Sequence, residues 1–192
     1  MTEFENPYFE EVAGGVTVGA NRSSWSDRAV EVLEERTDLV QEYAWAIPNE
    51  EAVETIAEHA PVVEVGAGAG YWAWCVDQLG ARIVATDPEP PRMDTYTEIL
   101  TKEAVEAVEC AREVFVGGYT LFVCWPPYED SMAADAVEAF EGDTLIYVGQ
   151  GRCGCTGDER LHRLLYEDWE LAETVPIPTY LGFNDRLEVW SR

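Results

Sequence analysis

Lysine is almost absent from this sequence, in which Lys102 is the only lysine among 192 residues. Lysine and arginine together number 12, against 38 aspartates and glutamates. Binding to a nucleic-acid backbone depends on cationic side chains that neutralise phosphates, and no stripe of basic residues stands out in the chain. The sequence therefore argues against a nucleic acid as the partner.

Long apolar runs are also missing, and none approaches the roughly 20 residues that a membrane-spanning helix needs. The amino-terminal residues, Met1 to Asn6, are acidic and precede no apolar stretch of the kind found in signal peptides. We therefore expect a cytoplasmic protein without a membrane span.

Histidine is nearly as rare as lysine, and the five cysteines are an odd number. An odd count without a secretory signal favours free thiols over a disulfide framework. Cys153 and Cys155 stand closer together than the usual zinc-ligand pair, and no second pair accompanies them. His59 and His162 fall at or within expected helices, where a structural role is the simpler one. We therefore expect no metal site.

The formal net charge is −26, and the carboxylates are spread along the chain rather than gathered in one tail. Self-repulsion of this size destabilises a compact state in dilute salt. At molar salt the Debye length falls to about 3 Å, so the repulsion is screened. The acid excess together with the lysine depletion indicates an extremely halophilic source. An ordinary acidic protein with a basic partner is the alternative.

The length and the 47% apolar content suit one domain with a sizeable core. We divide it into residues 1–60, an arm and helices packed on the same domain, and residues 61–192, the main α/β unit. Residues 1–24 show no sustained period and are expected to be irregular. A helix is expected from Ser26 to Pro48, and Asn49 is a candidate cap for a second one. Their expected apolar stripes are Val30, Leu33, Thr37, Val40 and Ala44 in the first helix, and Val53, Ile56 and Ala60 in the second.

From residue 61 onward, short β-branched runs alternate with helical patterns, which predicts a doubly wound, mostly parallel sheet. A final pair of extended stretches, around Gly182 and Asn184, is expected to be antiparallel. The expected strands are 62–65, 82–86, 97–101, 119–124, 144–148, 170–175 and 186–190. The expected helices are 71–79, one from Glu103, 132–140, and one capped by Asp158.

The strongest signal is the turn Glu64-Val65-Gly66-Ala67-Gly68-Ala69-Gly70, which lies between an expected strand and an expected helix. Glycines let the backbone turn tightly and approach a ligand closely. The spacing G-x-G-x-G, with an acid two residues earlier, differs from the dinucleotide fingerprint G-x-G-x-x-G and disfavours a nucleotide-binding oxidoreductase. Asp87 ends the next strand, at about the separation expected for a ribose-binding acid.

These residues resemble motif I of the class I, Rossmann-like methyltransferases that use S-adenosylmethionine (SAM). The resemblance implies a glycine turn, Gly66 to Gly70 with Ala67, lying against the cofactor, and an acid, Glu64, that orders this turn. It also implies that Asp87, followed by Pro88, accepts hydrogen bonds from the ribose. Glu103 resembles the acidic position near the adenine, although a solvated helix start explains it equally well.

Trp125-Pro126-Pro127-Tyr128 resembles motif IV, the [DN]-P-P-Y element of amino-methyltransferases, which implies a catalytic, substrate-facing loop. Trp125 replaces the acidic or amide residue, and an indole N–H donates a hydrogen bond but accepts none. Methylation of nucleic-acid base amines is therefore not expected. A rigid, aromatic-packed loop is the structural alternative.

Residues 43–192 further resemble an uncharacterised group of methyltransferase-like proteins that carry this W-P-P-Y sequence. Among the aromatic residues expected near the pocket, Trp45 is the candidate to fold back over the cofactor, since aromatic faces attract a sulfonium cation. We expect Trp125 and Tyr128 to form an aromatic wall on the acceptor side.

Two functions remain open at this stage. The first is a SAM-dependent methyltransferase acting on a small molecule or a protein, with catalysis resting mainly on alignment. The second is a SAM-binding module, or an inactive partner subunit, without methyl transfer. The sequence does not identify the acceptor or the oligomeric state.

Overall fold

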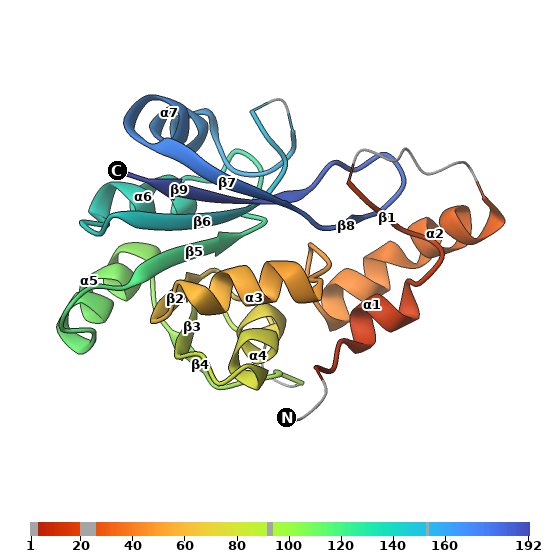
Figure 1. Cartoon of the computed structure of the whole chain (residues 1–192), viewed down its shortest axis with the longest axis horizontal. Helices are drawn as coiled ribbons and strands as arrows, with labels where there is room; N and C mark the ends of the chain where they lie inside the picture. Colours follow the sequence, from red (N-terminus) through yellow and green to blue (C-terminus); the bar gives the residue numbers. More distant parts are fainter. Residues whose placement is uncertain (1–3, 20–25, 92–93, 153) are drawn as a thin grey trace.

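The computed structural model describes residues 4–19, 26–91, 94–152 and 154–192. Its centre is a seven-stranded sheet with the order β4-β3-β2-β5-β6-β9-β7 (Figure 1). The strands of this sheet are β2 (Val62–Val65), β3 (Ile83–Asp87), β4 (Ile99–Thr101), β5 (Thr120–Cys124), β6 (Thr144–Gly149), β7 (Glu170–Pro176) and β9 (Arg186–Ser191). Strands β2 to β6 run parallel, and β9 lies antiparallel to both β6 and β7. The expected doubly wound sheet with an antiparallel carboxyl-terminal pair is confirmed.

The helices cover both faces of this sheet. Alternate strand residues point to opposite sides, and in β2 the residues on both sides are buried. Val62 packs in one core with residues of α1 to α4, whereas Val63 packs in a second core with residues of α5 to α7. The helices are α1 (Pro7–Glu11), α2 (Asp27–Glu42), α3 (Glu50–Glu58), α4 (Tyr71–Gln78), α5 (Ala104–Val114), α6 (Met132–Ala139) and α7 (Glu159–Asp168). Glu64 faces the same side as Val62, and this orientation puts a carboxylate inside the first core.

Residues 7–18 correct the expectation of an irregular arm. Pro7 opens α1, and the Asn6 side chain caps it by accepting a hydrogen bond from the Phe9 backbone. An asparagine cap followed by proline is a recognisable helix start that the sequence interpretation missed. Strand β1 (Thr17–Val18) then pairs with β8 (Pro178–Thr179), more than 150 residues later in the chain. Residues 1–3 and 20–24 of the expected arm lie outside the described residues.

The apolar stripe expected for α2 is also wrong in part. The helix buries Ala29, Val32, Leu39 and Val40, whereas Thr37 is exposed. It also ends at Glu42 rather than at Pro48, so Ala44 lies beyond it. The buried side of α2 is rotated because the helix packs against the amino-terminal segment: Val32 lies against Gly15 and shares a core with Tyr8 and Val12. In α3, Val53 and Ile56 are buried as expected, but the helix ends before Ala60, which is exposed.

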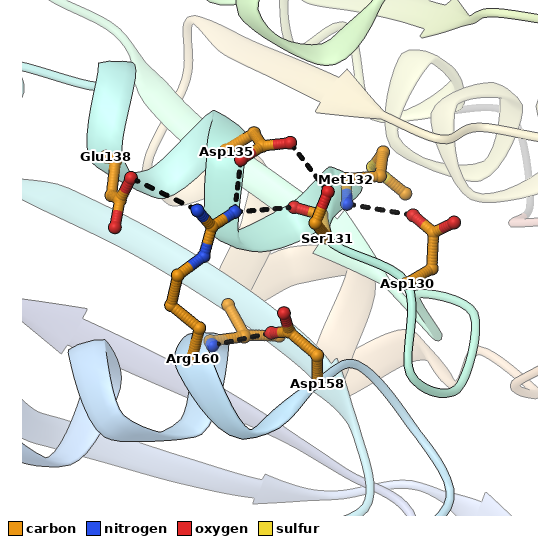
Figure 2. Close-up of polar contacts among 8 residues, drawn as sticks. Asp130, Ser131, Met132, Asp135, Glu138, Asp158 and Arg160 are labelled. Atoms are coloured by element: carbon orange, nitrogen blue, oxygen red, sulfur yellow. Dashed lines mark hydrogen bonds and ion pairs between the residues drawn. The ribbon is translucent and has the colours of Figure 1, made fainter.

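Helices α6 and α7 are joined by a polar cluster around Arg160 (Figure 2). The guanidinium of Arg160 pairs with Asp135 and Glu138 of α6. At the start of α6, the Asp130 carboxylate accepts a hydrogen bond from the Met132 backbone at 2.8 Å. The Met132 side chain packs beside Gly66, so these contacts hold α6 against the glycine turn.

Within the residues that the structure describes, no helix combines the length and the apolar character that crossing a bilayer requires.

Candidate functional site

A cavity of about 150 Å³ lies beside the glycine turn, at the carboxyl ends of β2 and β5. These two strands mark the point where the strand order reverses, and ligands of doubly wound sheets bind there. A larger, more open hollow of about 640 Å³ adjoins it and shares Gln41, Ala69 and Pro91 with it. The lining of the smaller cavity further comprises Val40, Tyr43, Ala44, Trp45, Glu64, Gly66, Ala67, Gly68, Trp72 and Cys124.

The glycine turn is fixed by its own backbone. The N–H groups of Gly66 and Ala67 both donate to the Thr86 carbonyl at 2.9 Å. A Cβ added at Gly66 would meet Met132 at 2.8 Å, and one added at Gly70 would meet Thr97 at 2.9 Å. At Gly68, by contrast, an added Cβ meets none of the described residues within 4 Å, although φ is +55°. Gly68 therefore faces space that no described side chain fills.

Asp87 holds this turn from the end of β3. Its Oδ2 accepts a hydrogen bond from the Gly68 N–H at 2.9 Å, and its Oδ1 accepts one from the Glu89 N–H at 2.8 Å. A carboxylate has about four acceptor positions, so each oxygen keeps one for a ligand hydroxyl. The structure thus gives Asp87 a turn-ordering role that the sequence interpretation had assigned to Glu64.

Glu64 is only 1% exposed, and its Oε2 has no hydrogen-bond partner among the described residues. Burial raises the pKa of Glu64 to about 8, against the lowering effect of a hydrogen bond from the Ala73 backbone. An unpartnered carboxylate oxygen beside a cavity costs stability unless a donor or a cation reaches it. The site is therefore suited to a ligand that carries an ammonium group or another strong donor.

The raised pKa of Glu64 predicts a pH dependence of stability. The unfolded chain releases this proton near pH 4.5 and the folded protein near pH 8. The free energy of unfolding is therefore highest below about pH 4.5, where both states hold the proton. It falls as the pH rises towards 8, by several kcal/mol in proportion to the pKa shift, and changes no further above that pH. Glu64→Gln should flatten this loss when urea unfolding is followed across the range. Glu54→Gln, at an exposed position of α3, should leave the slope unchanged, and an equal slope in Glu64→Gln would contradict the assignment.

Trp45 and Trp125 stack on each other above the cavity, with ring centroids 5.1 Å apart and planes 13° from parallel. Trp45 lines the cavity and is 49% exposed. Trp125 has a φ of +49°, a conformation that bulky residues rarely adopt. Its backbone N–H donates to the Val148 carbonyl at 2.7 Å, and its indole donates to Asp185 Oδ1 at 2.9 Å. A strained backbone conformation of this kind persists only where surrounding contacts stabilise it, and residues in such conformations cluster at functional sites.

Two residues on this side were missed by the sequence interpretation. The Arg36 guanidinium, from α2, lies against the rings of Trp45 and Trp125. Asp185 is 6% exposed, and burial raises its pKa to about 6, opposed by the Trp125 indole and by the Arg36 charge. The segment Asp185-Arg186-Leu187 carried part of the resemblance, but nothing in the sequence linked it to Trp125.

The expected wall of Trp125 and Tyr128 does not form. Tyr128 is 61% exposed and lines a different hollow of about 440 Å³, together with Arg152 and His162. Pro126 is buried and its carbonyl accepts a hydrogen bond from Gly157, whereas Pro127 is exposed. The Trp125 ring packs against Trp45 and Arg36, whereas Tyr128 lines the hollow beside Arg152, so the two rings do not line one pocket.

Glu103 and Pro88 stand beside the site without lining either cavity of the glycine turn. Glu103 is the exposed N-cap residue of α5, and its side chain makes no capping hydrogen bond. Pro88 directly follows Asp87. Their expected contacts with a cofactor stay predictions.

Cys153 lies outside the described residues. Among the residues that the structure does describe, no three histidine, cysteine or acidic side chains are grouped so as to hold a metal ion.

Comparison with protein-family models found no match, and comparison with curated proteins found none either. Among solved structures, the chain is similar to the magnesium protoporphyrin IX methyltransferase of Synechocystis PCC 6803 with bound SAM. The TM-score is 0.52 at 13% identity, over 97% of this chain and 90% of that one. It is also similar to the 1,6-didemethyltoxoflavin-N1-methyltransferase of Burkholderia thailandensis, with a TM-score of 0.50 at 14% identity, over 93% and 96% of the two chains. At these identities the likeness concerns the fold, and the chain has the α/β fold of the class I, SAM-dependent methyltransferases.

Proposed function

We propose that this protein is a methyltransferase that binds SAM beside the glycine turn and methylates a small molecule. The observation that carries the proposal is the buried Oε2 of Glu64, which lies at a cavity over Gly68 and has no hydrogen-bond partner in the described part of the chain. A ligand with an amino group and a sulfonium suits that carboxylate and the neighbouring aromatic rings. Structural neighbours of the same fold were solved with SAM or S-adenosylhomocysteine bound, which supports the choice of cofactor.

Each wall of the proposed site has a defined task. Asp87 orders the turn through Gly68 and offers its spare acceptor positions to ribose hydroxyls. Glu64 would pair with the positively charged amino group of SAM, and Trp45 covers the cavity from α2's carboxyl-terminal side. SAM supplies a methyl group that is already activated on sulfur. The chain's own residues need mainly to align the acceptor and exclude water.

We further propose that residues 1–60 belong to the same domain as residues 61–192. Val32 and Leu39 of α2 share one hydrophobic core with Val62 of β2. Helix α2 also contributes Val40 and Gln41 to the cavity, so the site would be incomplete without it.

Asp87→Ala should weaken the affinity for S-adenosylhomocysteine by about ten- to a hundred-fold, since a hydrogen bond to a charged group contributes about 1.5–3 kcal/mol. Calorimetric titration in molar KCl measures this directly. Asp77→Ala removes an exposed acid from α4 and is the matched control, with unchanged affinity expected.

The same titration with the 2′-deoxyribose analogue separates the two tasks of Asp87. If the carboxylate accepts from the ribose, the wild type should prefer the natural ligand and Asp87→Ala should lose that preference. Failure of the wild type to bind S-adenosylhomocysteine at all would overturn the proposed function.

The alternative is a protein that binds SAM without transferring its methyl group. One observation favours it: the position that offers an acceptor side chain in amino-methyltransferases is Trp125, whose indole N–H is already engaged by Asp185. Incubation with methyl-labelled SAM and an extract of a halophilic organism distinguishes the two. A labelled small molecule supports transfer, and SAM binding without any labelled product supports the alternative.

A further inference from the structure

The guanidinium of Arg36 is enclosed by four aromatic rings that come from three parts of the chain. Its central carbon lies 4.3 Å from the ring centroid of Phe183, 5.2 Å from those of Trp45 and Trp125, and 5.4 Å from that of Tyr180. All four distances fall within the range of cation–π attraction. We call these four rings the Arg36 cage.

The rings, rather than hydrogen bonds, hold this guanidinium. The Nε and Nη2 atoms of Arg36 are buried, and neither has a hydrogen-bond partner among the described residues. A buried arginine normally forms a forked pair with a carboxylate, because its N–H groups match that geometry. Arg36 forms no such ion pair within the described part of the chain. The cage therefore recognises the guanidinium by its positive charge and its planar shape.

A buried carboxylate completes the electrostatics of the cage. Asp185 accepts the indole N–H of Trp125 at 2.9 Å, and the Arg36 charge acts on its pKa without a direct ion pair. The carboxylate is anchored to a ring of the cage rather than to Arg36. The cage therefore presents aromatic faces and one negative charge, a combination that attracts a cation and repels an anion.

The cage also has the right position to face the proposed cofactor. Trp45 belongs both to the cage and to the cavity lining, and Trp125 follows Cys124, which lines that cavity too. Trp45 is half exposed, so this side of the cage is open to solvent. The cage thus lies next to the cavity at the end of β5, on the side where an acceptor would approach.

We propose that the Arg36 cage is the acceptor subsite and that it selects a planar organic cation of the amidinium or guanidinium class. In the structure the guanidinium of Arg36 occupies the place of that cation, and its side chain swings out when the acceptor enters. The inference rests on the proposed function for the identity of the neighbouring cavity, whereas binding of a cation to the cage is measurable by itself.

Three probes of equal shape and different charge test the selectivity: benzamidinium, neutral benzamide and benzoate. Each is titrated by calorimetry into the whole protein in molar KCl, with and without S-adenosylhomocysteine. We expect the wild type to bind benzamidinium about ten-fold more tightly than benzamide, and benzoate least, because the aromatic faces attract a cation. Arg36→Ala should strengthen benzamidinium binding by a further ten-fold or so, since the competing side chain is gone.

Two variants control this result. Arg28→Ala removes another arginine from α2, one paired at the surface with Glu31, and should bind the probes as the wild type does. Asp185→Asn keeps an oxygen for the Trp125 indole but removes the charge, and should weaken benzamidinium alone by about ten-fold. Should Arg36→Ala fail to unfold cooperatively, the ranking in the wild type and its change in Asp185→Asn decide the question.

Two outcomes would overturn the inference. Benzoate binding that is tightest in the wild type and lost in Arg36→Ala would make Arg36 an anchor for an anionic acceptor. Equal affinity for all three probes would reduce the cage to a structural contact between α2 and the Tyr180–Phe183 loop. Binding of S-adenosylhomocysteine in the same samples keeps the two proposals apart: if it binds while benzamidinium shows no preference, only the cage assignment falls.

Discussion

Gly68→Val should reduce the affinity for S-adenosylhomocysteine by about a hundred-fold, on the order of 3 kcal/mol, because the valine side chain takes up space that the ligand needs. No atom of the residues that the structure describes lies within 4 Å of a Cβ added at Gly68, so the new side chain projects into the cavity rather than into the core. The protein should still fold, with a stability cost of about 1–2 kcal/mol for a β-branched residue at positive φ. Calorimetry and thermal unfolding measure the two effects separately.

Gly80→Val is the matched control for this variant. Gly80 has a φ of +74°, and a Cβ added there also meets nothing within 4 Å, but the residue follows α4 and does not line the cavity. It should share the loss of stability and keep the affinity. If Gly68→Val and Gly80→Val lose affinity equally, backbone strain is the cause rather than occupation of the cavity. The glycine turn is then not the cofactor site.

Molar KCl should raise the melting temperature by on the order of 10 °C relative to dilute buffer, at about 2–4 °C per kcal/mol for a chain of this size. The cause is the formal charge of −26, whose self-repulsion opposes folding until salt screens it. We propose a halophilic source from the composition, and a protein from such a source should become more stable as the KCl concentration rises. Differential scanning calorimetry at increasing KCl concentration measures it.

A charge-reduced variant tests the cause. The substitutions change exposed glutamates that take part in no ion pair among the described residues, so that only the net charge falls. The substituted positions are Glu34→Gln, Glu54→Gln, Glu109→Gln, Glu113→Gln, Glu167→Gln and Glu170→Gln. This variant should be more stable than the wild type in dilute buffer and gain less from salt. A melting temperature that stays flat or falls with KCl would mean that the acids serve a basic partner instead.

Local patterns predicted most elements because each depends on neighbouring residues. The run Val62–Val65, the glycines that follow it and the cap residue Asp158 each specify their element within a few positions. The short strands β1 and β8 have no such pattern. They form because residues 17–18 and 178–179 meet in the folded chain, and a two-residue strand has no period to detect.

The candidate site divides in the same way. The glycine turn and Asp87 were predictable since a tight turn after a strand needs those residue types at that spacing. The hydrogen bond from Gly68 to Asp87 and the orphaned oxygen of Glu64 were not, because burial and partners depend on how strands β2 and β3 pair. The direction of Tyr128 was mistaken for a related reason: a pair of prolines restricts the backbone, but the surrounding packing decides where each side chain points.

The sequence by itself determined the alternation of strands and helices, the glycine turn at the end of β2, and the acid-rich surface, since period, spacing and composition are local or additive properties. Only the tertiary structure decided that Arg36, Trp45, Trp125, Phe183 and Asp185 meet. These residues are spread over 150 positions, and no local preference links them. They come together because α2 packs over the carboxyl ends of the parallel strands while β9 returns antiparallel beside β6. That return brings the loop before β9 to the same edge of the sheet.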